Sequence, residues 1–246
     1  MLGSGGMAEV FAAVHHPTAR NVALKRIKPA LGARTDLRIR FDNEIDLLRR
    51  CRGPFVLELI DSGVWEDQPA YVCERCVSSL YDMARDRPLP LPSVLRVASE
   101  ILVALDRVHA LGVVHRDIKP ANVLLGADGS VRLADFGVAR HPAVRLTQQG
   151  ARMGTQRYAA PEMKLDPRRA APAHDLYSLG LMILAVATHR RTDSLILPEC
   201  RPATLRAVPI ALEQILDRST HPDPTQRYRA ASEMAVDVQR ALASVT

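Results

Sequence analysis

Apolar and polar positions follow different patterns in the two parts of the chain. Up to residue 74, short apolar runs are separated by turn residues, which indicates β-strands. The expected strands cover residues 10–16, 21–28, 56–63 and 70–74. One helix is expected from Thr35 to Cys51. The first part of the chain is therefore predicted to be a β-rich lobe with a single helix.

From Ser79 onward the apolar positions recur at helical spacing. The expected helices cover residues 93–110, 175–188, 210–219 and 230–244. Ser93 is expected to cap the first of these helices, and Gly112 stands in a C-cap position behind it. The helix at 175–188 is apolar nearly all round, which is typical of a buried helix. The fold class is therefore predicted to be α+β, with a small β-rich lobe and a larger α-helical lobe.

Glu44 interrupts the apolar face of the helix expected at 35–51. Leu37, Phe41 and Leu48 lie on this face, and Glu44 falls between them. A carboxylate in a core needs a cation, and Lys25, at the end of the run Val-Ala-Leu-Lys, is the obvious candidate. The alternative is that Glu44 lies at the edge of the apolar face, in water.

The segment VVHRDIKPANVLL, residues 113–125, places ionisable and amide groups between two apolar ends. Such groups either pair with one another or serve a ligand, because unpaired polar groups are costly to bury. A hairpin turning at Asp128–Gly129 would carry Asp135 back beside Asn122. These two side chains would offer hard oxygen ligands to Mg²⁺, and Asp117 would stay free to accept a proton from a hydroxyl.

The N-terminal segment LGSGGMAEV carries glycines at positions 3, 5 and 6. Glycine lets the backbone approach a ligand closely and present its N–H groups to a phosphate. A tight hairpin with no ligand is equally compatible with this segment taken alone.

The net charge of +6 comes from 33 basic and 27 acidic residues, and the arginines are scattered along the chain. A nucleic-acid binder or a basic adaptor would need clustered charge, so no nucleic-acid partner is expected. Four cysteines are too few for a disulfide scaffold, and the pair Cys73 and Cys76 lacks a second pair for zinc. No leader and no membrane-spanning stretch is apparent, so a cytoplasmic location is expected.

Taken in order, these segments resemble the signature motifs of eukaryotic-like (Hanks-type) serine/threonine protein kinases. The matching segments are the glycine-rich loop at 3–10, Lys25 in VALK, Glu44, the loop HRDIKPAN at 115–122, Asp135-Phe136-Gly137, Ala160-Pro161-Glu162, Asp175 in HDLYSLG, and Arg227 in DPTQRY. The resemblance covers essentially the whole chain. It implies one protein kinase domain, 1–246, with an N-lobe at 1–73, a hinge at 74–78 and a C-lobe at 79–246.

The resemblance also implies the site residues and cofactors. Residues matched to catalytic positions are Asp117, Lys119, Lys25, Glu44 and Thr155. Residues matched to nucleotide contacts are Gly3, Ser4, Gly5, Gly6, Val10, Ala23, Lys25, Glu74, Cys76 and Leu124, with Cys73 as gatekeeper. Asn122 and Asp135 match the metal ligands. The implied cofactors are ATP and Mg²⁺ or Mn²⁺.

Two details narrow the implied activity. Lys119 and the segment GTQRYAAPE at 154–162 are similar to serine/threonine kinases, and Gly-Gly-Met-Ala-Glu-Val resembles bacterial members. The partner implied is a protein with a Ser or Thr acceptor. Arg116 resembles the arginine of kinases that are switched on by phosphorylation, with self-association as one route to autophosphorylation. Thr147 is the candidate phosphosite, and the alternative is that it is only an exposed loop residue.

The chain departs from the family pattern in three places. Ala8 replaces the third glycine of the loop, and only Met1 and Leu2 precede that loop. A truncated first strand and weakened nucleotide binding are therefore expected, which keeps a pseudokinase or nucleotide-binding scaffold as an alternative. A small-molecule kinase of the aminoglycoside type is a second alternative, but such kinases generally lack the Ala-Pro-Glu segment that this chain carries. The segment 188–207, where substrates and partners of the family often dock, is short and rich in Pro and Arg.

Overall fold

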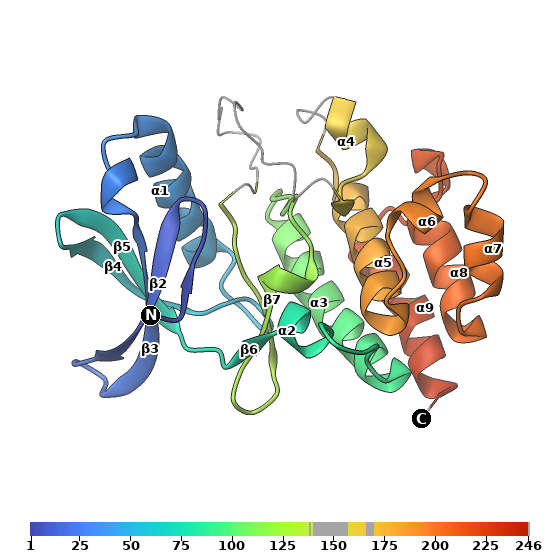
Figure 1. Cartoon of the computed structure of the whole chain (residues 1–246), viewed down its shortest axis with the longest axis horizontal. Helices are drawn as coiled ribbons and strands as arrows, with labels where there is room; N and C mark the ends of the chain where they lie inside the picture. Colours follow the sequence, from blue (N-terminus) through green and yellow to red (C-terminus); the bar gives the residue numbers. More distant parts are fainter. Residues whose placement is uncertain (138, 140–156, 166–169, 246) are drawn as a thin grey trace.

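The structure, a computed structural model, describes residues 1–137, 139, 157–165 and 170–245, without the side chains of residues 164 and 165. Figure 1 shows a twisted sheet with helix α1 at one end of the molecule and the remaining helices at the other. The predicted α+β architecture of two unequal lobes is confirmed.

The β-rich lobe is built on an antiparallel five-stranded sheet with the order β1-β2-β3-β5-β4. Its strands are β1 (Gly3–Ser4), β2 (Ala8–His15), β3 (Arg20–Ile27), β4 (Leu59–Trp65) and β5 (Gln68–Glu74). Glu66 and Asp67 join β4 to β5 with φ values of 48° and 60°, and this left-handed pair suits the twist of a hairpin. As expected from the sequence, β1 is short, with two residues.

Helix α1 (Thr35–Arg50) packs against β4 and β5 through a buried face. Phe41, Ile45, Leu47 and Leu48 are buried on this face, and Phe41 lies 5.4 Å from the ring of Tyr71 on β5. The apolar spacing that predicted this helix is therefore the spacing that anchors it to the sheet.

A second, three-stranded sheet lies where the two lobes meet. Its strands are β6 (Ser78–Ser79), β7 (Val123–Leu125) and β8 (Val131–Leu133), in that order. The turn between β7 and β8 contains Gly129 with φ 75°, so the predicted hairpin is confirmed. Val77 donates its N–H to the Leu125 carbonyl at 2.8 Å, which joins the connection after β5 to this sheet.

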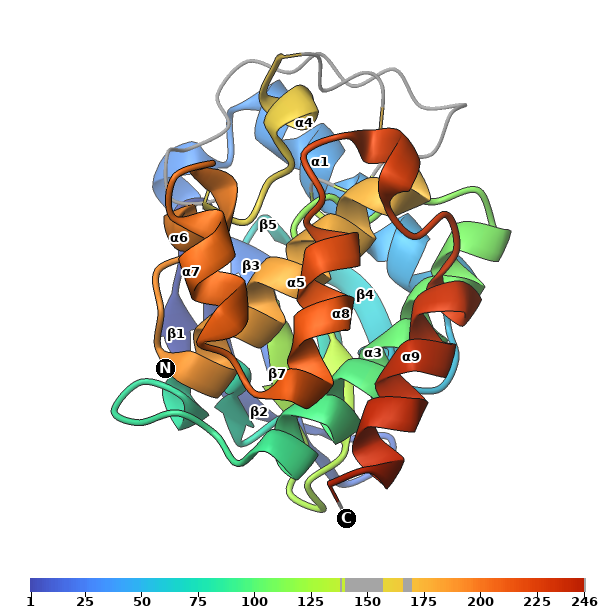
Figure 2. The ribbon, with the colours of Figure 1, turned by 90° about the vertical axis from the view of Figure 1, so that its right-hand side faces the viewer.

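Helix α3 (Leu91–Ala110) runs through the α-helical lobe, and Figure 2 shows α9 (Ala231–Ala243) lying along it. The prediction that Ser93 caps α3 is wrong. The helix begins at Leu91, with Pro90 at the N-cap and Pro92 in the first turn, where proline's fixed φ is compatible with a helix. The predicted C-terminus is confirmed, because Gly112 has a φ of 73° just behind the helix.

Helix α5 (Pro172–Thr188) is buried along most of its length, as its sequence predicted. Helix α8 (Ile210–Ser219) packs against it at Gly180. A Cβ atom at position 180 would lie 2.9 Å from Ser219 Cβ and 3.0 Å from Thr220 Cγ2. Only glycine permits this close approach of the two helices.

Shorter elements complete the larger lobe. They are α2 (Leu80–Met83), η2 (Pro120–Asn122), α4 (Pro161–Leu165), α6 (Asp193–Ile196), α7 (Arg201–Arg206) and η5 (Pro224–Gln226), and η1 (Pro29–Leu31) precedes α1 in the smaller lobe. Across the described ranges, no helix combines the length and the apolar character that crossing a bilayer requires.

Candidate active site

Lys25 and Glu44 form an ion pair between strand β3 and helix α1. The Lys25 Nζ atom lies 2.7 Å from Glu44 Oε1 and 2.9 Å from Oε2. Tyr71 opposes Lys25 on β5 and donates its hydroxyl to Oε1 at 2.9 Å. Glu44 is fully buried, so the predicted pairing is confirmed and the alternative of a solvated carboxylate is wrong.

The Lys25 ammonium lies between Glu44 of the smaller lobe and Asp135, which follows strand β8. Its side chain is 17% exposed, and its Nζ lies 4.0 Å from Asp135 Oδ1. Burial by itself would lower the pKa of Lys25, but the negative charges of Glu44 and Asp135 raise it to about 12. Lys25 is therefore held as a cation beside two carboxylates, where it can meet an additional anion.

Asp117 is fixed by two neighbours in its own loop. Its Oδ2 accepts from Lys119 Nζ at 2.6 Å and from Asn122 Nδ2 at 2.9 Å, and Nδ2 also donates to the Asp117 carbonyl at 2.8 Å. Asp117 Oδ1 accepts no hydrogen bond from any described residue. The polar groups of the segment 113–125 thus partly pair with one another, and one carboxylate oxygen is left for a ligand.

Asp175 of α5 supports this loop through its backbone. Its two oxygens accept the N–H groups of His115 at 2.9 Å and Arg116 at 2.7 Å, and His109 Nε2 lies 2.8 Å from Oδ2. Burial would raise the pKa of Asp175, but the hydrogen bond and charge of His109 keep it below its ordinary value. Arg116 has a φ of 70°, a conformation that costs about 1–3 kcal/mol and that these two hydrogen bonds stabilise.

His115 connects the loop to the segment that carries Asp135. Its Nδ1 accepts the Asp117 N–H at 3.3 Å, so the proton is on Nε2, which donates to the Ala134 carbonyl at 3.1 Å. The imidazole also packs edge-on against Phe136, with ring centroids 4.7 Å apart. The Ala134 N–H donates to the Asn122 carbonyl at 2.9 Å. These contacts place residue 135 beside Asn122, as the predicted hairpin required.

Asn122 and Asp135 fit a hard divalent cation. Because the Asn122 amide nitrogen donates to Asp117, its amide oxygen is the atom left for a metal. The Asp135 side chain is 40% exposed. Partial burial would raise its pKa, but Lys25 and Lys119 outweigh that effect and lower it. No cluster of three or more His, Cys, Asp or Glu suited to a metal occurs among the described residues.

Glu74 and Cys76, both matched to nucleotide contacts, differ in what their backbones can offer. The Glu74 N–H donates to the Glu58 carbonyl at 3.0 Å, whereas the Cys76 N–H has no partner among the described residues. Glu74 Oε1 accepts from Arg132 Nε at 2.7 Å and from the Glu58 N–H at 2.8 Å. The Cys76 N–H is therefore free to donate to a ligand.

The other residues matched to nucleotide contacts lie on strands β1, β2, β3, β5 and β7 and in the turn after β1. The segment after β1 closes as a hairpin, with the Gly5 N–H donating to the Ala8 carbonyl at 2.9 Å. Val10 on β2 opposes Lys25, Ala23 on β3 is buried, and Leu124 on β7 is half-buried. Gly3 and Ser4 form β1, and Gly6 lies in the turn behind it. Cys73 is buried opposite Ala23, and burial raises the pKa of its thiol to about 12.

Glu162 and Arg227 form a second ion pair in the larger lobe. Arg227 Nη1 lies 2.5 Å from Glu162 Oε1, and His174 Nε2 lies 3.1 Å from the same oxygen. His174 Nδ1 accepts the Ala171 N–H at 2.8 Å, so its Nε2 carries the proton that is donated to Glu162. Desolvation opposes the charge on Glu162, but hydrogen bonds from His174 and Arg227 lower its pKa to about 2.

Thr155 and Thr147, the expected catalytic threonine and phosphosite, lie outside the described residues. Four contact residues were missed in the sequence: Tyr71, His109, Arg132 and His174. Tyr71 could have been found, because it is inward-facing in an expected strand opposite the one that carries Lys25. No local signal marked the other three, because their partners lie far away in the sequence.

Comparison with known families identifies one match over nearly the whole chain. The model of the family described as "Protein kinase domain" matches residues 1–234. This range contains all the residues of the candidate active site described above.

Two curated relatives are mycobacterial proteins. The chain is 32% identical over 260 residues to the serine/threonine-protein kinase PknE of Mycobacterium bovis, covering 99% of this chain and 45% of that protein. It is 33% identical over 259 residues to PknD of Mycobacterium tuberculosis, covering 98% of this chain and 39% of that protein. The chain thus spans less than half the length of these relatives.

A solved structure is similar along nearly its full length. The PknI kinase domain of Mycobacterium tuberculosis superposes with a TM-score of 0.75 and 27% sequence identity. The match covers 98% of this chain and 94% of that chain. The arrangement of the two lobes is therefore shared with a kinase domain.

Proposed function

Because this chain belongs to the protein kinase domain family, we propose that it transfers the γ-phosphoryl group of ATP to serine or threonine hydroxyls of proteins. The observation that supports this most is the state of Asp117. Its Oδ2 is held by Lys119 and Asn122, and its Oδ1 is left to accept a hydrogen bond from a substrate hydroxyl. The domain proposed is 1–246, with an N-lobe at 1–73, a hinge at 74–78 and a C-lobe at 79–246.

The nucleotide would bind in the crevice between the lobes. The Glu74 carbonyl would accept from the adenine amino group, and the free Cys76 N–H would donate to the ring, between Val10, Ala23 and Leu124. Backbone N–H groups of the glycine-rich loop at residues 3–6 would approach the phosphates. Lys25 would bind phosphate oxygens, because Glu44 fixes its ammonium in the crevice.

The remaining residues would act on the hydroxyl and the transferred group. Asp117 would orient the hydroxyl and take its proton as the oxygen attacks the γ-phosphorus, while the bond to the leaving ADP oxygen breaks. Lys119, already 2.6 Å from Asp117, would balance negative charge on the phosphoryl group. Asn122 and Asp135 would hold Mg²⁺ or Mn²⁺, which when bound neutralises phosphate charge. Thr155 and autophosphorylation at Thr147 belong to the proposal by resemblance alone.

Transfer of labelled phosphate from ATP tests the proposal, with the chain itself and a generic basic protein as acceptors. Asp117→Asn is expected to reduce transfer by about 10²- to 10⁴-fold, because the amide cannot accept the proton. Asp106→Asn, an exposed carboxylate of α3, is the matched control and should transfer normally. Nucleotide binding with no transfer by either protein would instead support the pseudokinase alternative.

A further inference from the structure

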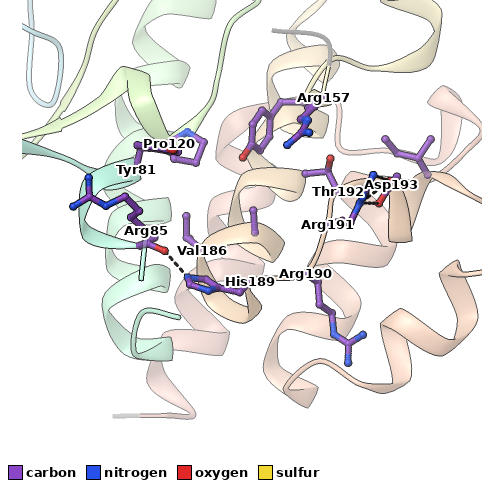
Figure 3. Close-up of a pocket in the computed structure, with 14 residues that line it drawn as sticks. Tyr81, Arg85, Pro120, Arg157, Val186, His189, Arg190, Arg191, Thr192 and Asp193 are labelled. Atoms are coloured by element: carbon purple, nitrogen blue, oxygen red, sulfur yellow. Dashed lines mark hydrogen bonds and ion pairs between the residues drawn. The ribbon is translucent and has the colours of Figure 1, made fainter. Parts of the chain in front are cut away.

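A pocket of about 620 Å³ lies in the larger lobe beside the catalytic loop (Figure 3). Its walls come from α2, from the C-terminal end of α5 and from the segment leading into α6, and Pro120 closes one side. Pro120 follows Asp117 by three residues, which span at most about 11 Å. A peptide with its hydroxyl at Asp117 would therefore reach this pocket with its neighbouring residues.

The rim of the pocket carries an excess of guanidinium groups. Arg85, Arg157, Arg190 and Arg191 all line it, and Asp193 is the only carboxylate among the described lining residues. Asp193 is already paired, because Arg191 Nη2 lies 2.7 Å from its Oδ2. Arg157 and Arg190 form no ion pair with any residue that the structure describes. Arg85 Nε lies 3.7 Å from Asp86 Oδ1, in an exposed pair. The rim therefore carries more positive charge than its neighbouring carboxylates neutralise.

Apolar side chains also line the pocket, and its walls are tied together. Tyr81, Val186 and Ile196 line it along with Pro120. His189 ends α5 in a left-handed conformation with φ 55°, and its Nε2 donates to the Ala84 carbonyl behind α2. Figure 3 shows this contact between the two walls. Apolar lining with a cationic rim suits a side chain that has methylene groups and a terminal carboxylate.

We propose that this pocket selects acidic protein substrates, by binding Asp or Glu side chains within about four residues of the phosphorylated Ser or Thr. The inference rests on the proposed phosphotransfer function and adds the class of substrate. Arg85, Arg157 and Arg190 would attract carboxylates at this distance, and basic side chains in the same positions would be repelled. Such pairs at an exposed rim act mainly at low ionic strength.

Peptide binding tests the inference without turnover. Two fluorescent peptides share one Ser and differ only in carrying Glu or Gln at the flanking positions, and anisotropy measures their affinity for the whole chain. The Glu peptide is expected to bind about threefold to tenfold more tightly at low salt. The double variant Arg85→Glu, Arg190→Glu should abolish or reverse this ratio. Arg206→Glu, the same charge change on exposed α7 outside the pocket, should preserve it.

Equal affinity for the two peptides, or a ratio that the double variant leaves unchanged, overturns the inference. The neutral variant Arg85→Gln, Arg190→Gln provides the same comparison if charge reversal disturbs folding. Phosphate transfer is then measured separately with both peptides. Transfer that shows no preference for the Glu peptide overturns the inference alone, whereas absence of transfer to any acceptor overturns the proposed function and leaves the binding ratio to be judged by itself.

Discussion

The two lobes each contain a short ion pair, and the pairs differ in which partner is enclosed. In the N-lobe, the Glu44 side chain is 0% exposed, whereas Lys25 keeps 17%. In the C-lobe, the cation Arg227 is 0% exposed and the carboxylate of Glu162 keeps 31%. The pair of Lys25 and Glu44 thus leaves its cation accessible, whereas the pair of Arg227 and Glu162 encloses its cation within the protein.

The further contacts of each cation follow from this difference. Lys25 lies 4.0 Å from Asp135, at the place proposed for the phosphates. Arg227 donates its Nε to the His221 carbonyl at 2.7 Å and lies 4.5 Å above the Tyr177 ring. The Nε, Nη1 and Nη2 atoms of Arg227 all donate to groups of the protein itself. We infer that the first pair serves ligand binding and that the second holds the lobe together.

Replacement of Arg227 by Met is the change expected to have the largest effect on this comparison. It leaves the His221 carbonyl without its donor and leaves Glu162 with His174 alone, and loss of one partner of a buried pair costs at most about 3–5 kcal/mol. Denaturant unfolding should show this loss in the free energy of unfolding, with nucleotide affinity unchanged in the folded fraction. The exposed Arg206→Met gives the baseline. A loss below about 1 kcal/mol would remove the structural role assigned to Arg227.

Neutralisation of the N-lobe pair should give the opposite result. In the double variant Lys25→Met, Glu44→Gln, the Gln oxygen can still accept the Tyr71 hydroxyl, so unfolding should change by no more than about 2 kcal/mol. Phosphate transfer should fall about 100-fold or more, because a fixed donor to the phosphates is lost. Transfer within threefold of the unmodified chain would contradict a ligand-binding role for this pair.

The two pairs should also respond to pH in opposite directions. The pKa of Glu162 falls from 4.5 to about 2 on folding, so its stabilisation is complete above about pH 4.5 and is lost toward pH 2. Lys25 has a pKa raised from 10.5 to about 12, so its contribution is complete below about pH 10.5 and is lost as pH rises through 12. After allowance for solvent screening, the Glu162 contribution is about 1–2 kcal/mol. The measurement is the free energy of unfolding of the unmodified chain and of Glu162→Gln at pH 6 and at pH 3. The difference between the two proteins should be smaller at pH 3.

A third pair joins Glu74, the last residue of β5, to Arg132 of β8, and it is expected to show the smallest effect. Both side chains are partly exposed, at 15% and 22%, so the pair contributes less than about 1 kcal/mol. Arg132→Gln should raise the KM for ATP about two- to threefold with kcat unchanged, because the Glu74 side chain loses one of its two donors. Arg96→Gln, on the exposed face of α3, is the control. A change in kcat alone would show that the pair acts elsewhere.

Local periodicity indicated the contact between Lys25 and Glu44, although it left a solvated Glu44 open as an alternative. A carboxylate on an apolar helical face requires a nearby cation, and the sequence offers a lysine at the end of a strand. The same periodicity predicted the two lobes and the buried character of α5. It worked for the lobes and for α5 because these expectations depended on spacing within single elements, whereas the choice of Lys25 as the partner came from the need of a buried carboxylate for a cation.

Contacts between distant segments could not be predicted in this way. The strand expected at 56–63 is observed at Leu59–Trp65. The preceding residues contact β8 instead, because Val56 forms a bridge with Leu133 and the Leu57 N–H donates to the Leu133 carbonyl at 3.0 Å. His174 and Arg132 likewise take their roles from partners that tertiary structure brings close. The motif resemblance supplied Asp175 and Arg227, but not the histidines beside them.

The close approach at Gly180 links helix packing to the anchoring of Arg227. Thr220 and His221 follow α8 directly, and their carbonyls accept from Arg201 at 2.9 Å and from Arg227 at 2.7 Å. A methyl group at position 180 would act as a wedge against Ser219 and Thr220 and would push this acceptor pair outward. Two arginines would then lose alignment through the gain of one carbon atom on α5.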